Sequence, residues 1–322
     1  MDALANVPSP EMQAVIERLA REDGRLGDPT LLPPAEGRAM AAAANVRWNR
    51  DLPALERCTD LSVPVEDGRA IDCRLFTPAR AASGLIFFIH GGGWAFCSID
   101  THERAARLLA VEAGVPVLSI SYRLAPENPF PAGLADCVVV WRQVRAGTSP
   151  LGAVDGPVAV AGDSAGANLA LALMLHEQAE SRPAPDQGLL FYGAYDADFG
   201  SQSYLEHACG PGLTRGKMMR YWNWYAPDPA ARANPLIAPL RAADAALAAL
   251  PPLYLNAAGI DPLRSDSENL HARLTALGRT DRLRIHRGVV HGFMQMSLDL
   301  AEARTATSEA AFAFREMAGA SK

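Results

Sequence analysis

Short apolar runs alternate with helix-like stretches along the chain from about residue 61 onward. The most apolar run, residues 85–89, is followed by a glycine-rich loop and a helix-like stretch at residues 101–113. Further apolar runs occur at residues 115–122, 157–163, 188–193, 252–259 and 283–288. A strand that is apolar along its whole length must be covered on both faces. The alternation therefore predicts an α/β fold, with a mostly parallel central sheet between helices.

The sequence also predicts one antiparallel edge for this sheet. Residues 61–67 and 70–78 have strand character and flank Asp67-Gly68, a dipeptide typical of a tight β-hairpin turn. We expect these two runs to pair with each other.

The first fifty or so residues indicate helices. Apolar side chains between residues 12 and 19 follow the i, i+3, i+4, i+7 spacing of one helix face, which predicts a helix beginning near Ser9-Pro10. The alanine-rich residues 37–50 predict a second helix. We expect residues 1–55 to form an N-terminal helical cap segment and residues 56–322 to form one α/β domain.

An insertion interrupts the alternation before residue 252. Nearly sixty residues separate two consecutive apolar runs, where a single crossover helix would suffice. Met218, Tyr221, Trp222 and Tyr225 recur there at helical spacing. They predict an extra helix in a cap insertion at about residues 196–232. Their aromatic stripe is equally consistent with an ordinary core face.

Composition excludes several classes of function. The 322 residues are 49% hydrophobic and 20% charged, with a net charge of −6 and no basic cluster, so nucleic acid or an anionic membrane is not expected as a partner. The five cysteines form no C-x-x-C pair, which argues against a disulfide framework and a zinc site. The first residues lack the pattern of a signal peptide, and residues 85–89 are too short to span a bilayer. We expect a cytoplasmic protein without membrane insertion.

One serine lies between a predicted strand and a predicted helix, in a sequence pattern that is typical of a catalytic nucleophile. Residues 158–170 contain the pattern G-x-S-x-G, in which Gly162 and Gly166 bracket Ser164 between a strand and a helix. In this context the serine occupies a sharp, strained turn that projects its hydroxyl from the carboxyl end of the sheet. Ser164 is therefore the candidate nucleophile.

A serine nucleophile needs a base and an orienting carboxylate, which follow it in the order acid, then histidine, in this class of fold. Of the seven histidines, His291 comes just after a predicted strand, in a loop from which its ring can reach Ser164. Asp261 directly follows another strand. The poorer candidates lie inside helices or strands or at a strand's start: His271, His286, Asp266 and Asp281.

The residues His-Gly-Gly-Gly-Trp at 90–94 directly follow the strand 85–89. Consecutive glycines allow backbone N–H groups to face a developing oxyanion, together with the N–H of the residue after the nucleophile. We expect the oxyanion hole to consist of Gly92, Gly93 and Ala165. A phosphate-binding loop is the alternative, but the spacing matches neither G-x-G-x-x-G nor a Walker motif.

With these motifs in this order, the chain resembles the hormone-sensitive-lipase-like branch of the α/β-hydrolases, which includes bacterial acetyl esterases. The resemblance covers the chain from about residue 60 to its end. The stretches that carry it are "HGGGW" (90–94), "YRLAPENPFPA" (122–132), "GDSAGANLA" (162–170), "DPLRSD" (261–266) and "HGF" (291–293).

This resemblance implies that Ser164, Asp261 and His291 act as nucleophile, acid and base, and that N-terminal helices and the insertion cap an acyl pocket. It also implies structural roles for Arg123 and Glu127. The chain departs from the family pattern in two places. Ser265 replaces a frequent second aspartate of the acid motif, and Ala167 replaces a frequent third glycine.

We therefore predict a serine carboxylesterase that hydrolyses short-chain acyl esters, from acetyl to about hexanoyl, without a metal or organic cofactor. Aromatic residues beside the oxyanion loop and in the insertion are candidates for lining the acyl pocket: Trp94, Phe96, Tyr195, Tyr221, Trp222 and Trp224. An amidase or arylformamidase on the same triad and a non-catalytic small-molecule receptor are the alternatives. A small-molecule ester is the expected partner, and the sequence is compatible with a homodimer.

Overall fold

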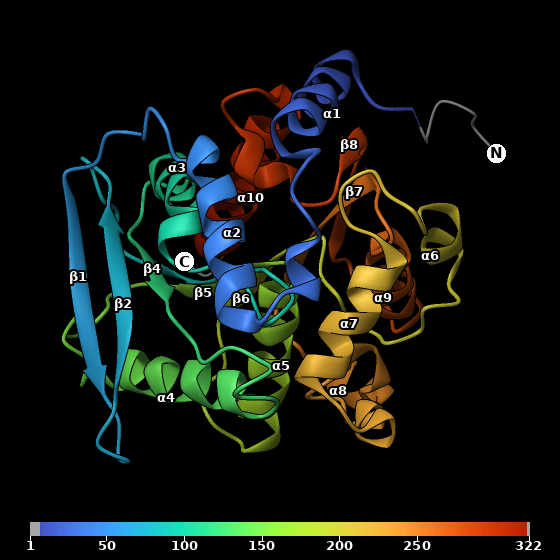
Figure 1. The fold of residues 1–322 in the computed structure, drawn as a ribbon. Helices are drawn as coiled ribbons and strands as arrows, with labels where there is room; N and C mark the ends of the chain where they lie inside the picture. The colour runs from blue at the N-terminus through green and yellow to red at the C-terminus, as the bar shows by residue number, and fades with distance from the viewer. Residues whose placement is uncertain (1–6, 321–322) are drawn as a thin grey trace.

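The computed structural model describes residues 7–320, which are built around an eight-stranded sheet (Figure 1). Its strands, in spatial order, are β1 (Arg57–Pro64), β2 (Ala70–Thr77), β4 (Val117–Ile120), β3 (Leu85–Ile89), β5 (Val158–Asp163), β6 (Gln187–Phe191), β7 (Leu253–Ile260) and β8 (Arg282–Val290). β2 is antiparallel to both of its neighbours, and the pairs from β4 to β8 are parallel. The predicted fold class and the predicted hairpin are both confirmed.

Helices cover both faces of the sheet, as the apolar strands require. Figure 1 shows α3 (Glu103–Ala113) and α10 (Ala301–Ala320) together on one side, and α4 (Ala132–Ala146) and α5 (Ala165–Ala179) on the other. β3 divides its side chains between the two resulting cores. Leu85, Phe87 and Ile89 pack with α4 and α5, and the alternate residues Ile86 and Phe88 pack with α3 and α10.

α5 lies at the centre of the larger core and is buried from Ala165 through Leu175. It packs between the sheet and two further elements, α4 and α8 (Asp244–Ala248). A helix that is apolar all round is stable in water only when it is enclosed in this way. α5 is therefore held rigidly behind the turn from which it begins.

The predicted N-terminal helices are present. α1 (Pro10–Asp23) begins after Ser9, whose hydroxyl caps the Met12 N–H. α2 (Pro34–Asn45) starts three residues earlier than predicted, because prolines favour its first turn, and it gives way to a 3₁₀ turn at Val46–Trp48.

The insertion contains the predicted aromatic helix as α7 (Arg215–Tyr225), preceded by the short α6 (Gln202–Glu206). α7 contacts the N-terminal segment. The Arg220 guanidinium donates to the Thr30 hydroxyl at 2.7 Å and pairs with the Asp28 carboxylate. These two parts of the chain, which are far apart in sequence, therefore form one connected layer.

α9 (Arg264–Ala276) connects β7 to β8 and completes the parallel part of the fold. Within residues 7–320, none of the helices has both the length and the apolar character needed to cross a membrane.

The burial of α5 predicts a stability cost for truncating it. Leu171 is fully buried, so Leu171→Ala should lower the free energy of unfolding by about 2–5 kcal/mol, through lost apolar burial and the cavity left behind. The matched control is Leu205→Ala, because Leu205 is 61% exposed and its loss should cost under about 0.5 kcal/mol. Urea unfolding followed by circular dichroism measures both. Equal midpoints for the two variants would contradict this view of the core.

Candidate active site

The turn between β5 and α5 forces Ser164 into a strained conformation, with φ of 56° and ψ of −119°. A Cβ atom on Gly166 would lie 2.0 Å from the Ile89 carbonyl oxygen, and one on Gly162 would lie 2.4 Å from the Gly166 oxygen. Only glycine allows strand and helix to approach so closely. The close packing on either side of the serine thus requires the two glycines of G-x-S-x-G. Ser164 itself adopts the strained backbone conformation.

A continuous chain of hydrogen bonds connects Ser164, His291 and Asp261. His291 Nε2 lies 2.9 Å from Ser164 Oγ, and His291 Nδ1 lies 2.7 Å from Asp261 Oδ2. The three residues follow the ends of β5, β8 and β7, which meet at the same edge of the parallel sheet. This arrangement can move a proton from the serine hydroxyl to the imidazole while the carboxylate fixes the ring.

The Asp261 side chain, the candidate acid, is also held by a backbone group. Asp261 is fully buried, and its Oδ1 accepts the Leu263 N–H at 2.9 Å. The Tyr192 ring packs edge-on against the His291 ring, with centroids 4.9 Å apart. Orientation of both side chains is therefore fixed before any substrate binds.

The poorer histidine candidates have structural contacts elsewhere. His271 Nε2 lies 3.0 Å from the Asp281 carbonyl oxygen, and His286 packs on Phe293 beside Glu309.

The poorer carboxylate candidates likewise stabilise loops. Asp266 accepts the N–H groups of Tyr195 and Asp196, and burial raises the pKa of its carboxyl well above the ordinary value. Asp281 accepts the Leu253 N–H and pairs with Arg279.

The loop after β3 has the backbone shape expected of an oxyanion hole. Gly92 and Gly93 have φ values of 106° and 59°, in the region that favours glycine. Gly91 donates its N–H to Asp163 Oδ1 at 2.8 Å, which anchors the start of the loop. Among the described residues, the N–H groups of Gly92, Gly93 and Ala165 have no hydrogen-bond acceptor. Three backbone donors are thus free to bind an anionic oxygen.

Four of the six predicted pocket residues are buried: Phe96 lies in a small hydrophobic cluster, and three others lie in the main hydrophobic core. Trp94, Tyr195 and Trp222 are each at most 1% exposed. The Trp94 ring stacks on Tyr225 at 4.4 Å, and its Nε1 donates to Asn168 Oδ1. For these three, the structure favours the alternative of an aromatic core face, because each ring is enclosed by its own neighbours.

The other three, Phe96, Tyr221 and Trp224, form an aromatic cluster beside the oxyanion loop, with ring centroids about 6 Å apart. Tyr221 and Trp224 are only partly buried. A Cβ atom on Gly93 would lie 2.4 Å from the Tyr221 ring, so the ring packs directly on that glycine. This contact brings the insertion to the oxyanion loop.

The two residues predicted to be structural do make structural contacts. Arg123 pairs with buried Asp136 at 2.9 Å. Glu127 pairs with Arg38, whose guanidinium also donates to the carbonyl oxygens of Ala95 and Ala125. Arg38 lies on α2, so this contact ties the N-terminal segment to the loops around the site.

Ser265, where the family often has a second aspartate, links the acid loop to α6. Ser265 donates its N–H to Ser203 Oγ at 2.9 Å, and Ser203 returns its own N–H to Ser265 Oγ at 3.1 Å. Ser203 Oγ also donates to the Pro262 oxygen. These hydrogen bonds therefore hold the loop that carries Asp261, although Ser265 departs from the family pattern.

Within the described residues, no group of three or more histidine, cysteine, aspartate or glutamate side chains is arranged to hold a metal ion.

Comparison with known proteins identifies the family of the chain. A model of the α/β-hydrolase fold family matches residues 86–295. The carboxylesterase NlhH of Mycobacterium tuberculosis is 34% identical over 240 residues, which cover 74% of this chain and 75% of that protein. An ethyl acetate hydrolase of Pseudomonas putida is 33% identical over 76% of this chain and 78% of its own length.

The solved structures that resemble this chain are also ester hydrolases. An ester hydrolase from the metagenome of Lake Arreo superposes with a TM-score of 0.89 at 29% identity, covering 98% of this chain and 99% of that one. The esterase of Pyrobaculum calidifontis superposes with a TM-score of 0.87 at 28% identity, covering 97% and 99%. The chain therefore belongs to the hormone-sensitive-lipase-like branch of the α/β-hydrolase family and is a carboxylic ester hydrolase.

Proposed function

We propose that the protein hydrolyses short-chain acyl esters, from acetyl to about hexanoyl, through an acyl-enzyme intermediate on Ser164. The observation that carries this proposal is the unbroken contact from Asp261 through His291 to Ser164, beside three backbone N–H groups without an acceptor.

Acylation begins when Ser164 Oγ attacks the ester carbonyl carbon and His291 Nε2 takes the hydroxyl proton. The carbonyl oxygen becomes an oxyanion, which the N–H groups of Gly92, Gly93 and Ala165 stabilise. His291 then gives its proton to the leaving alkoxide, and the C–O bond breaks. Asp261 holds the ring and stabilises the imidazolium during this step.

Deacylation repeats the sequence with water. His291 takes a proton from a water molecule, whose oxygen attacks the acyl carbon and forms a second oxyanion in the same hole. Collapse of this intermediate breaks the bond to Ser164 Oγ, which recovers its proton from His291. The products are a carboxylic acid and the free enzyme.

The preference for short acyl groups rests on the aromatic cluster Phe96, Tyr221 and Trp224. The Tyr221 ring lies directly on Gly93, so an acyl chain bound at the oxyanion loop meets it within a few carbons. The helix α7, which carries Tyr221 and Trp224, is held to the N-terminal segment by the pairing of Arg220 with Asp28. Relatives named ethyl acetate hydrolase and acetyl esterase support the same preference.

We also propose a cytoplasmic location and a small-molecule ester as the partner. All five cysteines are free, which suits a reducing compartment.

Ser164→Ala should lower kcat on p-nitrophenyl acetate by a factor on the order of 10⁶, because the chain loses its nucleophile. The matched control Ser62→Ala changes an exposed serine on β1 and should leave kcat unchanged. Steady-state kinetics on both purified variants measure this. A Ser164→Ala enzyme within tenfold of wild type would remove Ser164 from the mechanism.

Acyl-chain preference should peak between two and six carbons when kcat/KM is measured on p-nitrophenyl esters from acetate to dodecanoate. Tyr221→Ala should shift the optimum to longer chains, because it removes the ring that packs on Gly93. Met219→Ala is the control, since Met219 lies on the same helix and is 40% exposed.

A wild-type optimum at long chains, or an unchanged optimum in Tyr221→Ala, would contradict the role of the aromatic cluster. Ser164-dependent turnover of p-nitroanilides without turnover of the esters would instead favour an amidase.

A further inference from the structure

A buried polar cluster lies directly behind the nucleophile. Asp163 precedes Ser164 and is 5% exposed, and His102, at the start of α3, is 2% exposed. His102 Nε2 lies 3.3 Å from Asp163 Oδ1, the same oxygen that accepts the Gly91 N–H. The Gln295 side-chain amide, from the turn after His291, lies 2.7 Å from the same ring nitrogen. The proposed roles of Ser164, His291 and Asp261 use none of these side chains.

The Asp163 carboxylate determines where the oxyanion loop begins. A Cβ atom on Gly91 would lie 2.6 Å from Asp163 Oδ2, so the backbone of Gly91 rests directly on the carboxylate. The next two residues, Gly92 and Gly93, supply proposed oxyanion donors. A shift of Asp163 would therefore move both donors relative to Ser164, which is the carboxylate's own neighbour in the chain.

Electrostatics favour an ionised Asp163 in this position. Burial alone would raise the pKa of the carboxyl, but nearby His102 and the Gly91 N–H outweigh it and hold the pKa below its ordinary value. His90 stacks on Tyr122, and burial, together with the neighbouring His102 imidazole, lowers the pKa of His90 to about 4. His90 is thus neutral near pH 7, and His102 is the imidazole that contacts the carboxylate.

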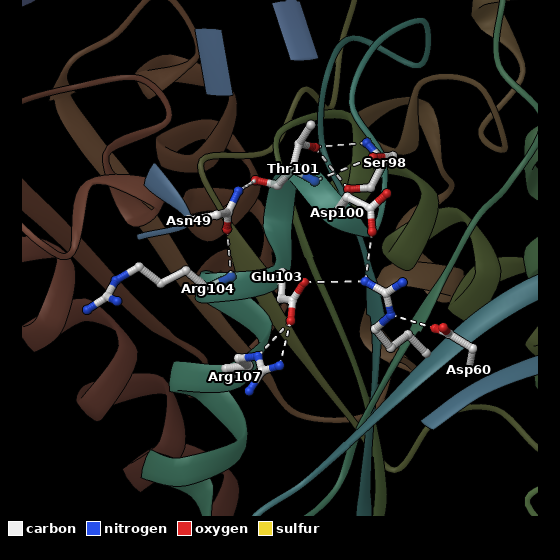
Figure 2. Close-up of polar contacts among 9 residues, drawn as sticks. Asn49, Asp60, Ser98, Asp100, Thr101, Glu103, Arg104 and Arg107 are labelled. Atoms are coloured by element: carbon white, nitrogen blue, oxygen red, sulfur yellow. Dashed lines mark hydrogen bonds and ion pairs between the residues drawn. The ribbon is translucent and has the colours of Figure 1, made fainter. Parts of the chain in front are cut away.

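Hydrogen bonds from two parts of the chain hold His102 and the turn around it. Figure 2 shows Asn49 between two backbone groups of the turn at the start of α3: its Nδ2 donates to the Thr101 oxygen at 3.1 Å, and its Oδ1 accepts the Arg104 N–H at 2.9 Å. Thr101 exchanges hydrogen bonds with Ser98 and places its hydroxyl 3.0 Å from His102 Nδ1. The imidazole is therefore fixed by its own turn and by the N-terminal segment.

We propose that His102 is a positioning residue for ester hydrolysis. It holds the Asp163 carboxylate, and through the Gly91 N–H it fixes the oxyanion loop relative to Ser164. This inference rests on the proposed function, because it gives the loop the task of binding the oxyanion.

The test compares two amide substitutions at His102. Glutamine can place its amide nitrogen near the position of Nε2 and donate to Asp163, whereas asparagine is too short to reach the carboxylate. Each variant is measured for kcat and KM on p-nitrophenyl acetate and for inhibition by a short alkyl trifluoromethyl ketone. The ketone adds to the serine as a hemiketal oxyanion, so its affinity reports on the oxyanion hole.

We expect His102→Asn to lower kcat by about tenfold to hundredfold and to weaken ketone binding by a similar factor, with KM within about threefold of wild type. His102→Gln should recover at least half of that loss on a logarithmic scale. His102→Leu should behave like His102→Asn, and it replaces that variant if the latter does not fold.

The control is the same pair of substitutions at His176. Its Nδ1 lies 2.9 Å from buried Glu177, so it also contacts a carboxylate, but at the far end of α5, about 18 Å from Ser164 along the helix. Both variants at His176 should keep the wild-type kcat and ketone affinity.

Four results would overturn the proposal. One is a kcat in His102→Asn within twofold of wild type. Another is a fall in thermal stability without weaker ketone binding, and a third is a glutamine variant as impaired as the asparagine variant. A wild-type activity that survives Ser164→Ala would contradict the proposed function and this inference together.

Discussion

The packing of Gly166 against the carbonyl oxygen of Ile89 is the contact on which the site depends. It brings the start of α5 so close to β3 that no side chain fits between them, and the intervening Ser164 adopts a left-handed φ of 56°. The same approach brings the β3 loop, with its glycines, beside Ser164. Burial of α5 on both sides stabilises this strained arrangement.

Segments far apart in the sequence hold the rest of the site around this turn. The carboxyl ends of β7 and β8 supply Asp261 and His291. The N-terminal segment contributes twice, through Arg38 on the loops near the oxyanion hole and through Asn49 on the turn that carries His102. The N-terminal helices are thus part of the support of the active site as well as candidates for its cap.

Sequence alone predicted the features that depend on local pattern. The strand–turn–helix around Ser164 and the loop-end positions of Asp261 and His291 follow from apolar runs and glycines, and the structure places all three side chains together. The sequence did not predict which side chains pack together when they come from distant parts of the chain. The helical spacing of Tyr221 and Trp222 predicted their helix but not which ring enters the core, because that depends on what packs against α7. The contact of His102 with Asp163 joins two segments that are distant in the sequence, and neither segment alone indicates it.

Covalent trapping of the reactive serine tests the roles of Ser164 and His291. The protein is treated with diethyl p-nitrophenyl phosphate, which phosphorylates an activated serine and releases p-nitrophenol, and the labelled peptide is then identified by mass spectrometry. We predict one label per chain, on Ser164, and no label when His291 is replaced by alanine. Labelling of a different serine, or equal labelling in His291→Ala, would contradict the assignment of nucleophile and base.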